Sequence, residues 1–130
     1  MIEDVCLHRL RRTGAGMVAV ERRADGQFLG GVGLSVVPWY PDDLQLGWRL
    51  VPAHWGHGYA TEAAALALRH AFAHLHLRQV VSFTVPANRR SRAVMERLGM
   101  TRSPADDFDH PKLPVGHPLR RHVLYRLRRP

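Results

Sequence analysis

The clearest chemical potential in this chain lies in a glycine-containing turn. Residues 55–61 read Trp-Gly-His-Gly-Tyr-Ala-Thr, and an alanine- and leucine-rich run follows them. Gly56 and Gly58 let the backbone approach an anion, and the first N–H groups of a following helix bind phosphate without side-chain charge. No P-loop lysine follows the glycines, and Thr61 stands where a dinucleotide fingerprint needs its third glycine. The turn predicts a phosphate cradle of another kind, or only a tight strand-to-helix connection.

A second candidate pair is Asn88 and Ser91. They are one helical turn apart, at the N-cap and third position of an expected helix, so both side chains point along the helix entrance. Such polar groups suit a ligand that enters there. Plain helix capping would also account for both residues.

The histidines and the cysteine give weaker signals. His70 and His74 have the i, i+4 spacing of a ligand pair and His76 follows them, but no carboxylate or cysteine completes a set. We interpret them as solvated helix-face residues, and the set of His110, His117 and His122 as loop residues, with Asp109-His110-Pro111 shaping a turn; no metal is expected. Cys6 is the only cysteine, which excludes an intrachain disulfide, and it reads as a packing residue rather than a nucleophile.

The elements that position these residues follow from periodicity and turn signals. Leu44 to Val51 alternates as a strand that ends at Pro52, and the glycine turn leads into a helix over about Tyr59 to Leu75. Next come a strand over Gln79 to Val85 and a helix over Asn88 to Leu98, which Gly99 closes.

The flanking segments complete the expected domain. Residues 1–14 predict a short amphipathic helix, and Met17 to Arg23 and Gln27 to Val37 predict two strands joined by a hairpin at Asp25-Gly26. Glycines inside the second run (Gly30, Gly31, Gly33) suggest a bulge or a close backbone approach. A loop of Pro38, Pro41, Asp42 and Asp43 follows, and the proline-rich stretch from Ser103 to Leu119 is expected to be irregular before a last strand around His122 to Leu127.

Composition sets the class of protein. The 130 residues predict one domain, 1–130, and 45% hydrophobic residues allow a real core. No apolar run is long enough for a membrane helix or a signal peptide, so the sequence predicts a soluble, cytoplasmic protein without a membrane partner. The net charge of +8, with Lys112 as the sole lysine among nineteen basic residues, suits an anionic partner such as a phosphorylated cofactor, an acidic protein or nucleic acid.

Two long motifs carry a resemblance to a known family. Leu46 to Ala63 resembles the acetyl-coenzyme A motif of the GNAT acetyltransferase superfamily, in the RimJ/RimL-like form Trp-Gly-x-Gly-Tyr-Ala-Thr-Glu-Ala. Asn88 to Met100 resembles that family's Asn-x-x-Ser-x-x-Val/Met helix, in the right order and spacing. The resemblance implies an α/β (α+β) fold with a mixed, mostly antiparallel sheet flanked by helices, and N-acetyltransferase activity with acetyl-coenzyme A (acetyl-CoA) as co-substrate.

The resemblance also implies a site. Asn88 would bond the pantetheine arm, Ser91 would lie near the sulfur as the donor to the departing thiolate, and the Val51 amide would pair with the arm and donate to the thioester carbonyl. Arg89, Arg90 and Arg92 would reach the nucleotide phosphates. The backbone that would hold the pyrophosphate is that of Trp55, Gly56, His57, Gly58, Tyr59, Ala60 and Thr61.

Departures from the family pattern concern the acceptor. The chain is expected to lack the family's usual first strand and helix, and Gln45 stands where related strands often carry a glutamate, although an amide cannot serve as a base. The acidic group Asp106, Asp107 and Asp109 is the nearest replacement in sequence terms, and solvated loop charges are an equally good interpretation of these carboxylates. Holding a lysine-like amine neutral at pH 7 costs ~4.6 kcal/mol and an α-amine only ~1.1 kcal/mol, so low-pKa amines such as peptide N-termini are expected as acceptors.

Three functions remain open. The sequence favours an N-acetyltransferase acting on a protein N-terminus or a small-molecule amine, and it admits a homodimer. A coenzyme A-binding protein without catalysis is the alternative, because of Gln45 and the short N-terminus. A basic nucleic-acid-binding module explains the charge but not the two motifs, and the aromatic-basic interleaving of single-strand binders is missing.

Overall fold

A computed structural model describes residues 4–12 and 17–130, and these form eight strands and two α-helices. Short 3₁₀ turns at Pro52–His54 and Pro104–Asp106 accompany them. In chain order the elements are β1 (Val5–Arg12), β2 (Val18–Arg22), β3 (Phe28–Val37), β4 (Tyr40–Leu50), α1 (Tyr59–Ala73), β5 (Gln79–Thr84), α2 (Arg89–Arg97), β6 (Thr101–Arg102), β7 (Phe108–Asp109) and β8 (Arg121–Arg128).

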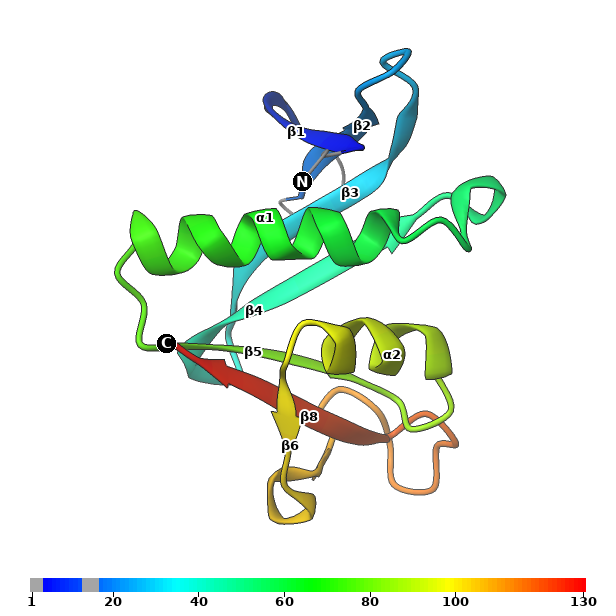
Figure 1. The fold of residues 1–130 in the computed structure, drawn as a ribbon. Helices are drawn as coiled ribbons and strands as arrows, with labels where there is room; N and C mark the ends of the chain where they lie inside the picture. Colours follow the sequence, from blue (N-terminus) through cyan, green and yellow to red (C-terminus); the bar gives the residue numbers. More distant parts are fainter. Residues whose placement is uncertain (1–3, 13–16) are drawn as a thin grey trace.

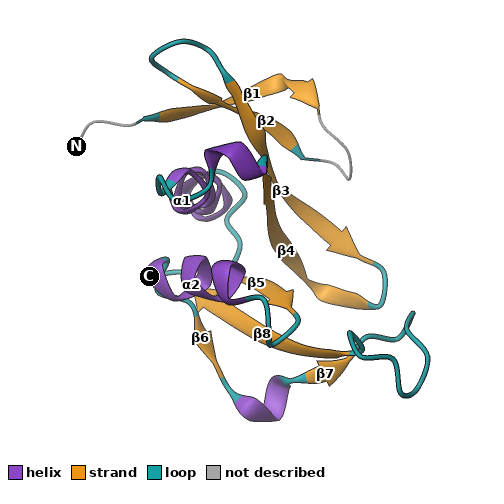
Figure 2. Cartoon of the chain, turned by 90° about the vertical axis from the view of Figure 1, so that its right-hand side faces the viewer, coloured by secondary structure: helices purple, strands orange, loops and turns teal. Residues whose placement is uncertain are grey.

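The strands form one mixed sheet in the order β1-β2-β3-β4-β5-β8-β6, with β7 paired to β8 outside this path. Every pair is antiparallel except β4 with β5, which is parallel. Both helices lie against the same face of the sheet (Figures 1 and 2). This arrangement confirms the predicted α+β class with a mostly antiparallel sheet.

The predicted helix over residues 1–14 is wrong for the part that the structure describes. Val5–Arg12 is a strand that pairs antiparallel with β2. Its alternation places Val5 and Leu7 in the core, with Val5 fully buried. The carboxylate of Glu62 on α1 accepts bonds from the backbone N–H groups of Asp4 and Val5, at 3.1 and 2.8 Å. Pairing with β2 and this anchor outweigh the weak helical periodicity, because edge pairing satisfies backbone groups that a short helix would leave at its ends.

The hairpin and the glycine run behave as predicted. Gly26 closes the β2–β3 connection with φ +70° and donates its N–H to the Arg22 carbonyl at 2.8 Å. A Cβ at Gly30 would lie 2.1 Å from the Arg49 carbonyl oxygen, so the backbones of β3 and β4 approach as closely as the glycines suggested. The loop expected over residues 38–43 is shorter, since β4 already begins at Tyr40.

The core lies between α1 and the sheet. Small residues on α1 (Ala63, Ala64, Ala67, Ala71) let the helix pack against Leu29, Val32, Leu46 and Val80. A second cluster of Met95, Met100, Val123 and Tyr125 seats α2 on β8. Together these contacts fix the N-terminal ends of both helices relative to β4. Among the described residues, no helix combines the length and apolar character needed to cross a membrane.

Candidate functional site

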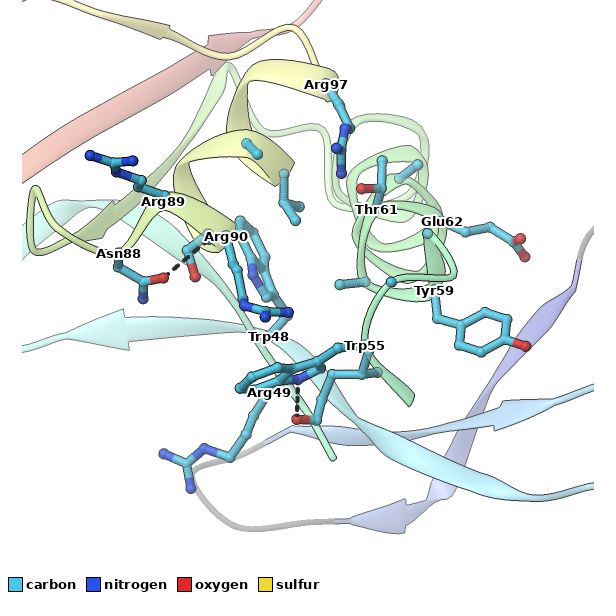
Figure 3. Close-up of a pocket in the computed structure, with 18 of the residues that line it drawn as sticks. Trp48, Arg49, Trp55, Tyr59, Thr61, Glu62, Asn88, Arg89, Arg90 and Arg97 are labelled. Atoms are coloured by element: carbon cyan, nitrogen blue, oxygen red, sulfur yellow. Dashed lines mark hydrogen bonds between the residues drawn. The ribbon is translucent and has the colours of Figure 1, made fainter. Parts of the chain in front are cut away.

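A cleft of about 1120 Å³ opens between α1, α2 and the end of β4. Its lining comes from Trp48 to Leu50, the glycine turn, the first turns of α1, and α2 from its N-cap to Arg97. In Figure 3 the Trp48 ring lies between the two helices, and Arg97 reaches from α2 toward Thr61. The volume suits a long ligand rather than a compact metabolite.

The cleft exists because β4 and β5 separate. They share a single bridged pair, Gln45 with Val81, and the Ser82 hydroxyl donates to the Leu46 carbonyl at 2.9 Å. Beyond these bonds no ladder pair joins the two strands. The backbone edge of β4 after Leu46 therefore faces an opening in the sheet, which we call the split.

The glycine turn points backbone donors into this cleft. Gly56 and Gly58 have φ of +87° and +78°, which glycine adopts without steric cost. The first helical hydrogen bond of α1 runs from the Glu62 N–H to the Gly58 carbonyl, so the N–H groups of the three residues before Glu62 have no helical acceptor. Six of the seven residues predicted in this turn line the cleft: Trp55, Gly56, Gly58, Tyr59, Ala60 and Thr61.

His57, the seventh, does not line the cleft. Its ring stacks on Tyr59 with the centroids 5.3 Å apart. The turn alternates direction at the two glycines, and this carries the His57 side chain away from the lining. Its predicted role in holding a ligand therefore rests on its backbone alone.

Thr61 carries an unsatisfied polar atom. Its Oγ1 is buried and has no hydrogen-bond partner among the described residues. Buried hydroxyls are almost always bonded, so an orphan beside a cleft indicates a missing partner. An anionic oxygen at the N-terminus of α1 would provide one.

Arginines give the cleft its charge. Arg49, Arg69, Arg89, Arg90 and Arg97 line it. The Arg90 guanidinium lies 4.1 Å from the Trp55 ring centroid, and the Trp55 indole N–H donates to the Leu50 carbonyl at 2.9 Å, so the pair forms one wall (Figure 3). This charge favours an anionic ligand.

Arg92 does not join them, contrary to the prediction. Its guanidinium donates to the Tyr125 hydroxyl at 3.3 Å and to the Pro86 carbonyl at 3.0 Å. Arg92 is two positions past Arg90, and this spacing turns it to the sheet side of α2. It holds α2 to β8 and is not available to a ligand in the cleft.

Asn88 and Ser91 both line the cleft at the start of α2. The Asn88 side chain accepts from the Ser91 N–H at 3.2 Å and donates to the Thr84 hydroxyl at 3.1 Å, so it caps α2 and ties it to the end of β5. The capping interpretation therefore holds for Asn88. The hydroxyl of Ser91 has no hydrogen bond to any residue in the described ranges and faces the cleft as a donor.

The predicted use of the Val51 amide is wrong. Its N–H donates to the Leu29 carbonyl of β3 at 2.9 Å. Successive residues of a strand point their backbone groups to opposite sides, so the N–H of Leu50 faces the split instead. Leu50 lines the cleft and Val51 does not. The register of β4 on β3 therefore determines that the N–H of Leu50, and not that of Val51, faces the split.

The acidic loop residues also differ from the prediction, because each one pairs with an arginine. Asp106 accepts from Arg126 at 2.9 Å, Asp107 binds Arg102 through two bonds, and Asp109 accepts from Arg120 at 3.2 Å. The hydrogen bond from Arg102 lowers the pKa of Asp107, so this carboxylate is a weaker base than usual. The three do not form a group that could take a proton from an amine.

No group of three or more metal-ligating side chains occurs within residues 4–12 and 17–130. His70 and His74 lie with their rings 5.2 Å apart, and His110 shapes a turn by accepting the Lys112 N–H at 3.1 Å. Sequence reasoning missed Trp48, Arg49, Arg69 and Arg97 as lining residues. The sequence assigns Trp48 only to an alternating strand, and no local signal indicates that β5 separates from β4 beside it.

The sequence and the fold both match known acetyltransferases. The acetyltransferase (GNAT) domain model matches residues 2–101. FsC-acetyl coenzyme A-N(2)-transacetylase of Aspergillus fumigatus is 39% identical over 85 residues, which are 60% of this chain and 36% of that protein.

Solved structures give the same result. An acetyltransferase from Agrobacterium tumefaciens superposes with a TM-score of 0.68 at 35% identity, over 86% of this chain and 60% of that one. Ribosomal-protein-S5-alanine acetyltransferase from Vibrio fischeri superposes with a TM-score of 0.71 at 18% identity, over 87% of this chain and 61% of that one, a likeness of fold. The chain thus spans about a third of the curated relative and three fifths of these two structures.

Proposed function

Because the chain belongs to the GNAT acetyltransferase superfamily, we propose that it is a member of the RimJ/RimL-like branch and transfers an acetyl group from acetyl-CoA to a primary amine. The observation that carries this proposal is the cleft itself. It joins a helix N-terminus with unpaired N–H groups to a split in the sheet beside Ser91.

The lining residues fit coenzyme A in their chemistry. The pyrophosphate would accept from the N–H groups at the start of α1 and from the orphan Thr61 hydroxyl. Arg90 and Arg97 would neutralise phosphate charge, and the exposed Trp55 face offers an apolar surface. The pantetheine arm would run along the open backbone edge of β4 to the split.

The chemistry asks three things of this protein. The amine must attack the thioester carbonyl while neutral, the carbonyl oxygen must be stabilised as it gains charge, and the departing sulfur must be protonated. The Leu50 N–H faces the split and suits the oxygen, and the Ser91 hydroxyl suits the sulfur. Asn88 acts as a positioning residue, since its side chain holds the Ser91 backbone and the end of β5 together.

The acceptor is either a protein N-terminus or a small-molecule amine. Two solved structures with the same fold are named for acceptors of these two kinds: a ribosomal-protein-S5-alanine acetyltransferase and a spermidine N-acetyltransferase, each from Vibrio. A cytoplasmic location and a homodimer also belong to this proposal, and cell fractionation and size-exclusion chromatography test them.

The alternative is a coenzyme A-binding protein without catalysis. It is favoured by Gln45, which brings an amide to the bridged pair where β4 and β5 last meet. The same cleft would then bind the cofactor and leave it intact.

One experiment separates these functions. Calorimetry with coenzyme A measures binding, and thiol release from acetyl-CoA measures turnover with glycine amide, phenylalanine amide, spermidine and an alanine-initiated peptide. Binding with amine-dependent thiol release supports the enzyme. Binding without thiol release for any amine identifies the non-catalytic protein, and absence of binding refutes both.

A further inference from the structure

A cluster of aromatic rings lies on the face of the sheet away from the helices. It consists of Trp39, Phe83, Phe108, His110 and His122, which we call the ring cluster. Trp39 contacts Phe83, Phe108 and His110 with centroid distances of 5.2, 5.3 and 4.8 Å. His122 stacks on Phe108 at 5.5 Å and lies 5.1 Å from His110. All five side chains are half-buried, so the cluster is apolar and still reachable from solvent.

Strand alternation fixes the face on which the cluster lies. On β5, Val80 packs against the core under α1, so Phe83, three positions on, points to the opposite face. On β8, Val123 packs with Met95 of α2, so His122 also points away from the helices. Figure 2 shows β7 and the β3–β4 turn, which supply Phe108 and Trp39, close together and away from α1 and α2.

The cluster also lies at the level of the split. Phe83 immediately precedes Thr84, whose hydroxyl binds Asn88 at the mouth of the cleft. Gly47 on β4 and Phe83 on β5 each lie two residues past the bridged pair of Gln45 and Val81, so they stand on opposite sides of the split. Gly47 puts no side chain next to the opening on this face, and its nearest neighbour there is the end of the flexible Met17 side chain. The split therefore has the proposed cofactor site on one side and the ring cluster on the other.

Hydrogen bonds fix the neutral tautomer of each imidazole. His122 Nδ1 lies 3.2 Å from the Arg120 carbonyl oxygen, which can only accept, so the proton is on Nδ1 and Nε2 carries the lone pair. His110 Nδ1 accepts the Lys112 N–H at 3.1 Å, so its proton is on Nε2. His122 is thus presented as a base and His110 as a donor.

The surroundings of His110 favour its neutral form. Burial lowers the pKa of His110, and the positive charges of His122 and Lys112 lower it further. The other charged groups nearby are Asp109 on β7 and Arg120 and Arg121 before and at the start of β8, and Asp109 pairs with both arginines.

We propose that the ring cluster binds the acceptor amine and that His122 is the general base of the transfer. This inference rests on the proposed function. The amine nitrogen, entering from the far face, forms a bond to the acetyl carbon as His122 Nε2 takes its proton. The carbon–sulfur bond breaks, coenzyme A leaves as the thiolate while the Ser91 hydroxyl donates a hydrogen bond to its sulfur, and His122 then releases the amine proton to solvent.

The same cluster selects the acceptor. Aromatic rings favour an apolar or aromatic group beside the amine, because ring pairs attract each other beyond the apolar area that they bury. The three carboxylates of the adjoining loop are already bound to arginines, so a polycation gains little there. The acceptor class is therefore an α-amine on an apolar or aromatic body, rather than a polyamine.

The test compares His122→Phe, on β8, with His117→Phe, in the loop that precedes β8. Phenylalanine preserves the stacking on Phe108 but removes the base. We expect kcat/KM for phenylalanine amide to fall at least 100-fold in His122→Phe, with coenzyme A affinity and melting temperature unchanged. In the wild type, kcat/KM should fall more steeply toward acidic pH than the titration of the amine alone requires, and this additional fall should be absent from His122→Phe. His117→Phe should retain wild-type rates and profile.

Acceptor choice gives a second readout that does not depend on the variants. Phenylalanine amide should have a KM about tenfold below that of glycine amide, which shares its amine but lacks the ring, and spermidine should be the poorest of the three. If His122→Phe does not fold, His122→Asn replaces it, since its amide N–H can still donate to the Arg120 carbonyl.

Wild-type turnover with an unchanged rate and pH profile in the His122 variants would overturn this inference alone. A preference for spermidine would overturn the acceptor class. Absence of coenzyme A binding or of transfer to any amine by the wild-type protein would instead refute the proposed function, and the base assignment with it.

Discussion

Replacing Gly58 by alanine tests whether the cofactor is held by backbone rather than side chains. Gly58 is the N-cap of α1 and has φ +78° and ψ +9°. A Cβ built there meets no heavy atom within 4 Å, so the substitution introduces no clash. Its cost comes from the left-handed backbone, which an L-residue adopts at a penalty of about 1–2 kcal/mol.

This strain sets the expected loss of affinity. In the free Gly58→Ala variant the turn relaxes toward negative φ, which rotates the N–H groups that follow residue 58, and binding must restore the left-handed conformation. Because 1.4 kcal/mol is a factor of ten, the Kd for coenzyme A should rise about 5- to 30-fold in Gly58→Ala. Gly58→Val, with a branched side chain in the same position, should abolish binding.

Calorimetry with coenzyme A measures this effect, and two variants serve as controls. Gly116 has a similar φ of +86° and equally open surroundings, but it is not among the residues that line the cleft. Gly116→Ala should lower the free energy of unfolding as much as Gly58→Ala and leave the Kd unchanged. His57→Ala removes a side chain outside the cleft and should change the Kd less than twofold.

Equal losses of affinity in Gly58→Ala and His57→Ala would refute the backbone cradle. An unchanged Kd in Gly58→Ala would refute it as well, because the orientation of the N–H groups would then not matter.

Three further predictions concern single side chains. Ser91→Ala should lower kcat about 100-fold or more in a thiol-release assay with little change in coenzyme A affinity, and an unchanged kcat would reduce Ser91 to a capping role. Arg90→Leu should weaken coenzyme A binding about tenfold and reduce the salt dependence of that binding. Arg92 binds groups of the protein itself, so Arg92→Leu should lower the melting temperature and leave the affinity for coenzyme A unchanged. The hydrogen bond from Arg22 lowers the pKa of Asp25 from 3.8 to about 2, so the stability that this ion pair contributes is present above pH 4 and is lost as the pH falls toward 2. The difference in melting temperature between wild type and Asp25→Asn should therefore shrink over that pH range. A constant difference would contradict the ion pair.

Local signals were sufficient to predict the elements that line the cleft. The glycine turn, the cap at Asn88 and the stop at Gly99 each depend on bonds within a few residues, so the sequence alone predicted α1, α2 and the part of the cleft lining that lies at the N-terminal ends of these helices. The β2–β3 hairpin was predictable for the same reason. Its glycine satisfies a backbone requirement of the turn itself.

Pairing between distant segments decided the rest. Residues 5–12 became a strand because β2 offered an open edge, and the register of β4 on β3 assigned the Val51 amide to Leu29. The loop carboxylates pair with arginines that lie 5 to 20 residues away in the sequence, and the ring cluster consists of side chains that lie between residues 39 and 122. Such contacts are set by the packing of the whole sheet, and short-range periodicity carries no information about them.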